Sequence, residues 1–165
     1  MSLIFDIVFI ILLVSICAIL AHFVCDKRKP NLNKMSFRET MDLCDLPIVT
    51  FLNNGNKFNF LLDTGASKSV INTEVLQSMS YKEANISGNV YGMDGKRYET
   101  SYVNVLLNYR GREYEEEFQV LDMSAPFGNL KNDFGINVHG ILSSAFFEKY
   151  RYILDYNELV AYSVV

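Results

Sequence analysis

The sequence predicts a mostly β domain with one or two short helices, compatible with a small closed β-barrel, behind a single N-terminal transmembrane helix. Three observations predict this arrangement. Residues 7–24 form a long uncharged run. From residue 46 onward, short strand-like segments alternate with turn signals. One of these strands, residues 60–62, is entirely apolar and leads directly into Asp63. The chain therefore divides into an anchor at 1–25, a juxtamembrane linker at 26–42 and a domain at 43–165.

The uncharged run is long enough to cross the hydrocarbon core of a bilayer and too long for the core of a signal peptide. No basic residue precedes it, and bulky residues precede Cys25, so the sequence predicts an uncleaved anchor. Lys27, Arg28 and Lys29 follow the run at once. Because positive flanking residues favour the cytoplasmic side, we expect a single-pass membrane protein whose domain faces the cytoplasm.

The linker and the start of the domain differ in pattern. Residues 26–42 are polar and lack sustained periodicity, which indicates a tether with one short helical turn near 38–41. We then expect a strand at 46–52, a hairpin turn at 53–56 containing Asn-Gly, and a returning strand at 57–62. A short helix at 72–79 follows.

The later segments continue the alternation of strands and turns. We expect strands at 89–91, 96–107 and 113–120, a loop at 122–137, an apolar strand at 138–142, a helix at 144–150 and a closing hairpin formed by 152–154 and 159–164. The acidic run Glu115, Glu116 and Glu117 is predicted to lie on a solvated strand edge that resists pairing.

Composition excludes several classes of function. The net charge is −4 and the chain carries no basic stripe, so the electrostatic footprint of a nucleic-acid binder is missing. No Cys/His spacing suggests a metal site, and we expect neither a metal nor another cofactor. The glycines of residues 88–95 have the wrong spacing for a phosphate-binding loop.

The stretch with the clearest chemical signal is Phe-Leu-Leu-Asp-Thr-Gly-Ala-Ser at residues 60–67, followed by Ser-Val-Ile at 69–71. An Asp-Thr-Gly turn after a strand is by itself common, because Asp and Gly are favoured turn residues. The full string, however, resembles the active-site loop of the retropepsin-like aspartic proteases of clan AA, which consist of a single lobe. The anchor would make this chain a membrane-bound member of that family.

Two further segments extend the resemblance over residues 46–164. Tyr91, Gly92 and Met93 stand where family members carry the tip of a mobile hairpin, the flap that covers the substrate. The late segment 138–142 is similar to the family's apolar strand, in which Gly140 packs against the active-site loop. Relatives commonly have a glycine where this chain has Ser143. His139 has no nucleophile to partner it, and we expect a structural role for it.

The resemblance also implies a mechanism. Peptide hydrolysis by this route needs two carboxylates that share a proton, and the chain contains a single Asp-Thr-Gly. The resemblance therefore implies a homodimer in which each chain contributes a catalytic Asp63. Thr64 would join the two loops, Gly65 would leave room for a peptide substrate, and Ala66 and Ser67 would complete the hydrogen-bonded support of the carboxylate.

Two other interpretations remain open from the sequence. Beside the protease, one alternative is an inactive protease-like module that binds extended peptides at the membrane, and the other is a structural β-barrel in which Asp-Thr-Gly is coincidental. The intact string at 63–67 argues against an inactive site.

Overall fold

The computed structural model describes residues 15–16, 34–91 and 97–163, apart from the side chains of 85–87, 89–91 and 97–99. The chain forms two compact units, Met1–Asn31 and Leu32–Val165. Among the residues described, no helix combines the length and the apolar character that crossing a bilayer requires. Apart from Ser15 and Ile16, the predicted membrane segment at 7–24 lies outside the described residues.

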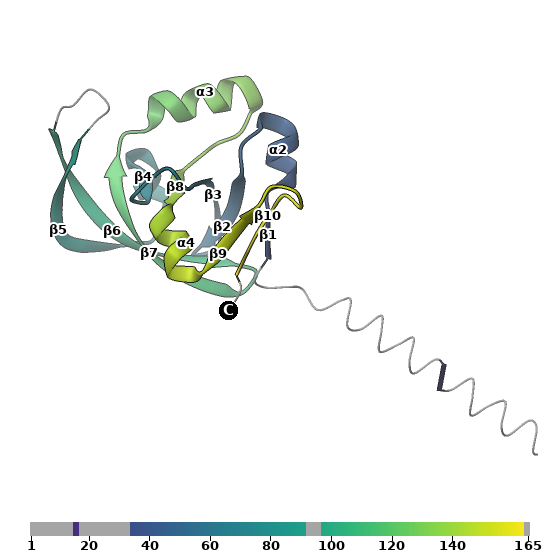
Figure 1. Ribbon diagram of the computed structural model, residues 1–165. Coiled ribbons are helices and arrows are strands. Elements are labelled where there is room, and N and C mark those ends of the chain that lie inside the picture. Colours follow the sequence, from purple (N-terminus) through teal and green to yellow (C-terminus); the bar gives the residue numbers. More distant parts are fainter. Residues whose placement is uncertain (1–14, 17–33, 92–96, 164–165) are drawn as a thin grey trace, which may run out of the picture. The chain divides into compact units, whose positions relative to one another are not determined.

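The second unit is built around a barrel (Figure 1). Its larger sheet has seven described strands in the order β2-β3-β8-β4-β7-β6-β5, and β2 also pairs with β6 at Leu52 and Asn108, which closes the barrel. The strands of this sheet are β2 (Ile48–Asn53), β3 (Asn56–Asp63), β4 (Val70–Asn72), β5 (Lys82–Tyr91), β6 (Arg97–Tyr109), β7 (Arg112–Leu121) and β8 (Gly140–Ser143). The predicted mostly β closed barrel is confirmed.

Turn residues with positive φ set the hairpins of this sheet. Asn54 and Gly55 join β2 to β3 with φ of 47° and 84°, and Arg110 and Gly111 join β6 to β7 with φ of 51° and 88°. Two consecutive residues with positive φ match the right-handed twist of the flanking strands. Asn-Gly is the preferred sequence for such a turn, and the turn predicted at 53–56 is present.

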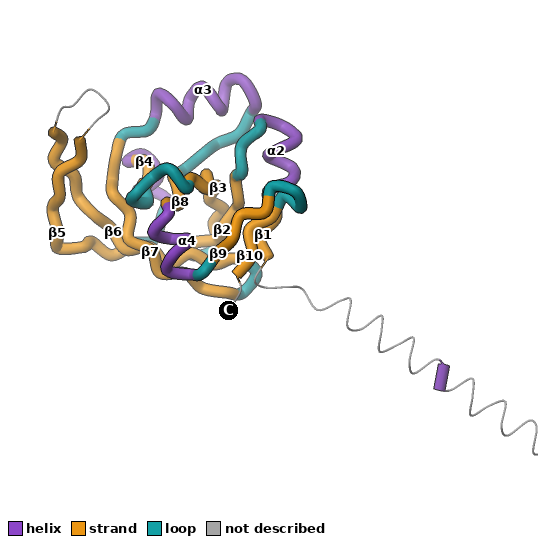
Figure 2. The backbone as a smooth tube through the Cα atoms, in the orientation of Figure 1, coloured by secondary structure: helices purple, strands orange, loops and turns teal. Residues whose placement is uncertain are grey.

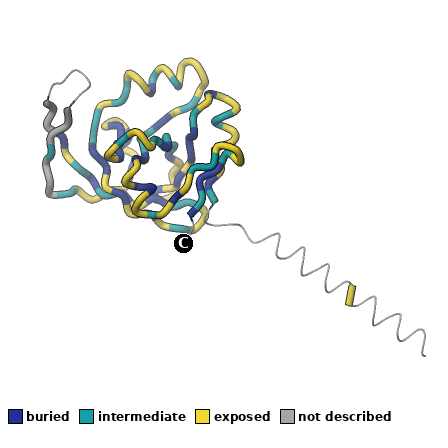
Figure 3. Tube along the Cα trace, in the orientation of Figure 1, coloured by how far each residue is buried: buried dark blue, intermediate teal, exposed yellow. Residues whose placement is uncertain are grey.

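The core of the barrel is aromatic. Phe58, Phe60 and Leu62 alternate along β3 and point inward, as the two-residue period of a strand requires. The ring of Phe51 on β2 forms T-shaped pairs with the rings of Phe60 and Phe146. Figure 3 shows the buried segments gathered along the inner strands. This apolar interior supports β3 up to the point at which it ends in Asp63.

The described part of this unit also contains four short helices: α2 (Arg38–Cys44), the 3₁₀ helix η1 (Thr73–Ser78), α3 (Ser124–Phe134) and α4 (Ser144–Tyr150). The helix predicted at 144–150 is confirmed, and the one predicted at 72–79 is a 3₁₀ helix. The loop predicted at 122–137 is wrong, because it contains α3 (Figure 2). Phe127 of α3 is buried in a small cluster with Ile48 and Val138, and this packing outweighs the low helix propensity of a Gly- and Asn-rich segment.

The described residues also form a smaller sheet of three strands. Its order is β1 (Lys34–Ser36), β10 (Val160–Ser163) and β9 (Tyr152–Asp155), so the predicted C-terminal hairpin is present and has an additional partner. Met35 and Phe37 are buried in the main core. The predicted linker therefore does not extend to residue 42, because these two apolar side chains draw 34–44 into the folded unit. Two apolar residues are too few to show a period in the sequence.

The acidic run on β7 is also placed differently from the prediction. β7 is an interior strand between β4 and β6, and only Glu115 and Glu117 are exposed. Glu116 is 5 % exposed and faces inward with Tyr114 and Phe118. The prediction of a solvated edge is wrong for Glu116, because successive side chains of a strand alternate between its two faces.

Candidate active site

Asp63 is the last residue of β3. There it pairs with Ser143, the last residue of the parallel strand β8. The side chain of Asp63 is half-buried. Its Oδ1 accepts a hydrogen bond of 2.8 Å from the Gly65 N–H, and its main-chain oxygen accepts one of 3.3 Å from the Ala66 N–H. The carboxylate is thus held at the end of a buried strand by its own turn.

Glycine at position 65 allows this turn to pass close to the carboxylate. A Cβ at this position would lie 3.2 Å from Asp63 Oδ1, which is tighter than an ordinary van der Waals contact. Thr64 and Ser67 are exposed, and the bond to the carboxylate comes from the Gly65 main chain. Ala66 contributes through its carbonyl oxygen, which accepts hydrogen bonds from Ser144 N (3.0 Å) and Ser144 Oγ (2.8 Å). The first residue of α4 therefore holds the loop.

Gly140 lies where β8 contacts the rest of the site. A Cβ there would meet the Val70 main-chain oxygen at 2.5 Å and the Phe60 ring at 2.9 Å, so no side chain fits. His139 precedes it, and its Nδ1 accepts the Asn59 N–H at 2.8 Å. Burial lowers the pKa of His139, which favours the neutral ring that this hydrogen bond requires. His139 thus serves as a structural acceptor for β3.

A buried polar cluster behind the loop was not predicted from the sequence. Ser69, at the far end of the loop, donates a hydrogen bond of 2.7 Å from Oγ to Glu116 Oε1. Its Oγ also accepts the Ser143 N–H at 3.1 Å and lies 3.2 Å from Ser143 Oγ. The alternation Tyr114-Glu116-Phe118 on β7 is the sequence signal that places Glu116 on the inner face.

The flap residues predicted from the sequence are described only in part. Tyr91 is the last residue of β5 and pairs with Arg97 of β6, while Gly92 and Met93 lie outside the described residues. The two strands pair in antiparallel fashion over most of their length (Figure 1).

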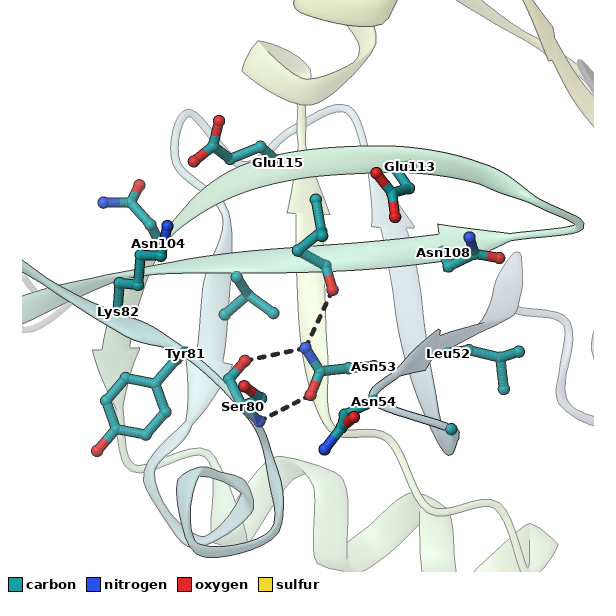
Figure 4. A pocket seen from close by; sticks show the side chains of 13 residues that line it. Leu52, Asn53, Asn54, Ser80, Tyr81, Lys82, Asn104, Asn108, Glu113 and Glu115 are labelled. Atoms are coloured by element: carbon teal, nitrogen blue, oxygen red, sulfur yellow. Dashed lines mark hydrogen bonds between the residues drawn. The ribbon is translucent and has the colours of Figure 1, made fainter.

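A cavity among the described residues lies away from this site. It has a volume of about 700 Å³ and is lined by the β2–β3 turn, residues 80–82 and the outer face of β6 and β7 (Figure 4). Asn53 forms part of its wall: its Nδ2 donates to Ser80 O and Leu106 O, and its Oδ1 accepts from Ser80 N. None of the predicted site residues lines this cavity. In the part of the chain that the structure describes, no three His, Cys, Asp or Glu side chains could together hold a metal ion.

A closed barrel with an Asp-Thr-Gly turn at the end of β3, packed against the parallel strand β8, defines the class of single-lobe, retropepsin-like aspartic proteases. The sequence pattern of the family described as aspartyl protease matches residues 49–144, which is more than half of the chain. The chain belongs to the aspartyl protease family.

The chain is similar to several solved structures. The retroviral protease-like domain of Ddi1 from Leishmania major is 12% identical with a TM-score of 0.53, and the match covers 73% of this chain and 90% of that one. EIAV protease in complex with the inhibitor HBY-793 is 25% identical with a TM-score of 0.48, covering 66% and 90%. A retropepsin-like aspartic protease from Rickettsia conorii is 14% identical with a TM-score of 0.44, covering 70% and 79%. No curated protein matches the chain significantly.

Proposed function

We propose that this protein is an aspartic endopeptidase whose active site forms at the two-fold axis of a homodimer, with one Asp63 from each chain. The observation that carries the proposal is the position of Asp63: a half-buried carboxylate at the end of β3, with Oδ1 hydrogen-bonded to Gly65 N at 2.8 Å. One such turn per chain supplies half of a carboxylate pair.

The proposed chemistry follows from bringing two carboxyl groups together. Two such groups at close range share one proton, because both cannot be charged. The charged carboxylate takes a proton from a water molecule, and the water oxygen attacks the carbonyl carbon of the peptide bond. The protonated carboxyl gives its proton to the carbonyl oxygen. The carboxyl that took the water proton then gives it to the leaving nitrogen. Collapse of the tetrahedral intermediate breaks the C–N bond and returns a hydroxyl proton to the other carboxylate.

Several features of the loop support pairing of two chains. Thr64 is exposed next to Asp63, so its hydroxyl is available to the loop of a second copy. A two-fold axis would place the same residues of both chains opposite each other, as an isologous interface requires. Gly65 would leave space for the main chain of an extended peptide, and residues 91–93 of the β5–β6 hairpin would cover it.

We also propose that residues 7–24 anchor the enzyme in a membrane with its domain in the cytoplasm. The uncharged run and the basic residues Lys27, Arg28 and Lys29 support this proposal. Confinement to a surface raises the effective concentration of chains and favours dimers. Flotation of the full chain with phospholipid vesicles tests the anchor: the protein should remain with the vesicles in high salt and alkaline carbonate. Release by carbonate would contradict it.

The test of activity uses the full chain in mild detergent and a mixed peptide library at pH values from about 4 to 7, where carboxylate pairs share a proton. Asp63→Asn is the critical variant, and Asp133→Asn is its matched control, because Asp133 lies exposed on α3. We expect cleavage by the wild type and the control and none by Asp63→Asn. Analytical ultracentrifugation establishes the dimer in the same samples. A dimeric wild type that binds extended peptides without cutting them would instead identify an inactive peptide-binding module.

A further inference from the structure

Glu116 is a buried carboxyl that the proposed chemistry does not use. It is 5 % exposed and lies on β7 between the fully buried side chains of Tyr114 and Phe118. Burial of a carboxylate is costly unless hydrogen bonds and opposite charge compensate it. Ser69 provides the hydrogen bond, at 2.7 Å to Oε1, and Lys149 provides the charge, with Nζ at 3.7 Å from Oε2. Glu116 is therefore held in a definite orientation behind the active-site loop.

The hydrogen bonds of Ser69 determine which groups of this cluster are donors and which are acceptors. A hydroxyl has one proton to donate and two lone pairs that accept. Ser69 donates its proton to Glu116 and accepts the Ser143 N–H at 3.1 Å. The remaining contact is the 3.2 Å pair of Ser69 Oγ and Ser143 Oγ, and there Ser143 must be the donor. The Ser69 hydroxyl thus donates one hydrogen bond and accepts two, and the Glu116 carboxylate fixes the orientation of its O–H.

The cluster spans the base of the active-site loop. Ser143 pairs with Asp63 where β3 ends, and Ser69 lies at the other end of the loop, immediately before β4. The carbonyl oxygen of Ser69 also accepts the Gln119 N–H of β7 at 2.9 Å. The contact between Ser69 and Ser143 therefore fixes the two ends of the loop relative to each other. Ser143 contributes both its N–H and its hydroxyl to this contact.

We propose that Glu116 is a positioning residue: through Ser69 and Ser143 it fixes the active-site loop, and with it the Asp63 carboxylate, against β8. This inference rests on the proposed function. It differs from a purely structural role, in which the cluster would only satisfy its own buried polar atoms. A purely structural cluster would affect folding, whereas a positioning cluster affects turnover in a protein that is still folded.

The kinetic test compares three variants of the full chain. Glu116→Leu removes the acceptor for Ser69 at similar volume, Glu116→Gln keeps an acceptor oxygen, and Glu117→Gln changes the charge of an exposed neighbour. We expect Glu116→Leu to lower kcat about tenfold with KM within about twofold of wild type, because misplaced catalytic groups slow the chemical step. Glu116→Gln should recover most of kcat, and Glu117→Gln should match the wild type. Glu116→Leu leaves the buried Ser69 hydroxyl without its acceptor, so its melting temperature should fall, but circular dichroism at the assay temperature should show a folded protein.

A second readout does not need activity. The Ser143 amide donates to Ser69 Oγ, so its hydrogen exchange reports on the cluster directly. We expect this amide to exchange about tenfold faster in Glu116→Leu than in wild type, and to be unchanged in Glu117→Gln. The measurement can also be made on the Asp63→Asn background.

The two readouts separate failure of this inference from failure of the proposed function. Unchanged exchange and unchanged kcat in Glu116→Leu would overturn the positioning role and leave the peptidase standing. If the wild-type dimer cuts no peptide, the exchange measurement decides alone: faster exchange in Glu116→Leu supports the fixing of the loop, and unchanged exchange overturns it. A loss of kcat in Glu116→Leu that Glu116→Gln does not recover would also overturn it.

Discussion

Asp63 and Ser143 are neighbours in the parallel ladder of β3 and β8, each at the end of its strand. Asp63, which carries the proposed chemistry, is therefore paired along the backbone with Ser143, the residue immediately before α4. Because Ser143 also contacts Ser69, both ends of the active-site loop depend on the position of β8. Changes that displace β8 should for this reason affect the whole site.

Replacement of Gly140 by alanine should destabilise the domain strongly. The added Cβ would lie 2.5 Å from the Val70 main-chain oxygen, and β8 cannot move away because it pairs with β3 and β4 on its two sides. We expect the free energy of unfolding to fall by about 3 kcal/mol, as in overpacked cores. Denaturant titration followed by circular dichroism measures it. Gly128→Ala is the control: a Cβ there meets nothing within 4 Å, and in helix α3 it should raise stability by up to about 1 kcal/mol. Equal midpoints for the two variants would contradict the prediction.

Asn53→Asp should loosen the segment that contains Ser80. The side-chain Nδ2 of Asn53 donates hydrogen bonds to the carbonyl oxygens of Ser80 and Leu106. The carboxylate of an aspartate at this position would place a negative charge beside both oxygens. We expect a loss of about 2 kcal/mol in unfolding free energy, the cost of leaving buried polar groups unpaired. Asn54→Asp, at the exposed hairpin turn, provides the control and should change stability little. Thermal unfolding of Asn53→Asp and Asn54→Asp measures the difference. Coincident unfolding transitions of the two variants would contradict the prediction.

His139 should titrate below the ordinary histidine range. Burial lowers its pKa from 6.5, and the neutral ring is the form whose Nδ1 can accept the Asn59 N–H. Because the unfolded chain then binds a proton that the folded chain does not, this group's contribution to stability is complete above pH 6.5 and is lost as the pH falls through the lowered pKa. NMR titration of the imidazole signals, assigned with His139→Gln, measures the pKa directly. A value at or above 6.5 would refute the assignment of a neutral acceptor.

Glu116 should produce the opposite dependence of stability on pH. Burial raises the pKa of its carboxyl above 4.5, while Ser69 and Lys149 lower it and Glu117 raises it slightly. The folded chain therefore holds a proton that the unfolded chain has released. Stability should decline as the pH rises from 4.5 through the raised pKa.

The variant Glu116→Gln isolates this contribution, since its side chain does not titrate. The difference in unfolding free energy between wild type and Glu116→Gln should change across the same range of pH. Equilibrium unfolding at a series of pH values gives this difference. Parallel curves for the two proteins would show that Glu116 has an unperturbed pKa.

Short stretches of sequence were sufficient to predict those features that depend on neighbouring residues. The Asn-Gly turn after β2, the helix at 144–150 and the strand that ends in Asp63 depend on the backbone preferences and apolar runs of a few consecutive residues. The residues at 60–71, Gly140 and the order of these segments were enough to indicate the family. The turn around Asp63 is local as well, since Gly65 lies two residues away.

Tertiary structure alone decided the rest. The helix α3 forms because Phe127 packs against Ile48 and Val138, and β1 joins the domain because Met35 and Phe37 enter the core. Glu116 appears in the sequence as one of three equivalent acids, and only the pairing of β7 between β4 and β6 turns it toward Ser69. Ser69 and Ser143 are 74 residues apart in the chain, so no local pattern relates them. The physical reason is the same in each case: burial and hydrogen bonding between distant segments are free-energy terms that short-range propensity does not contain.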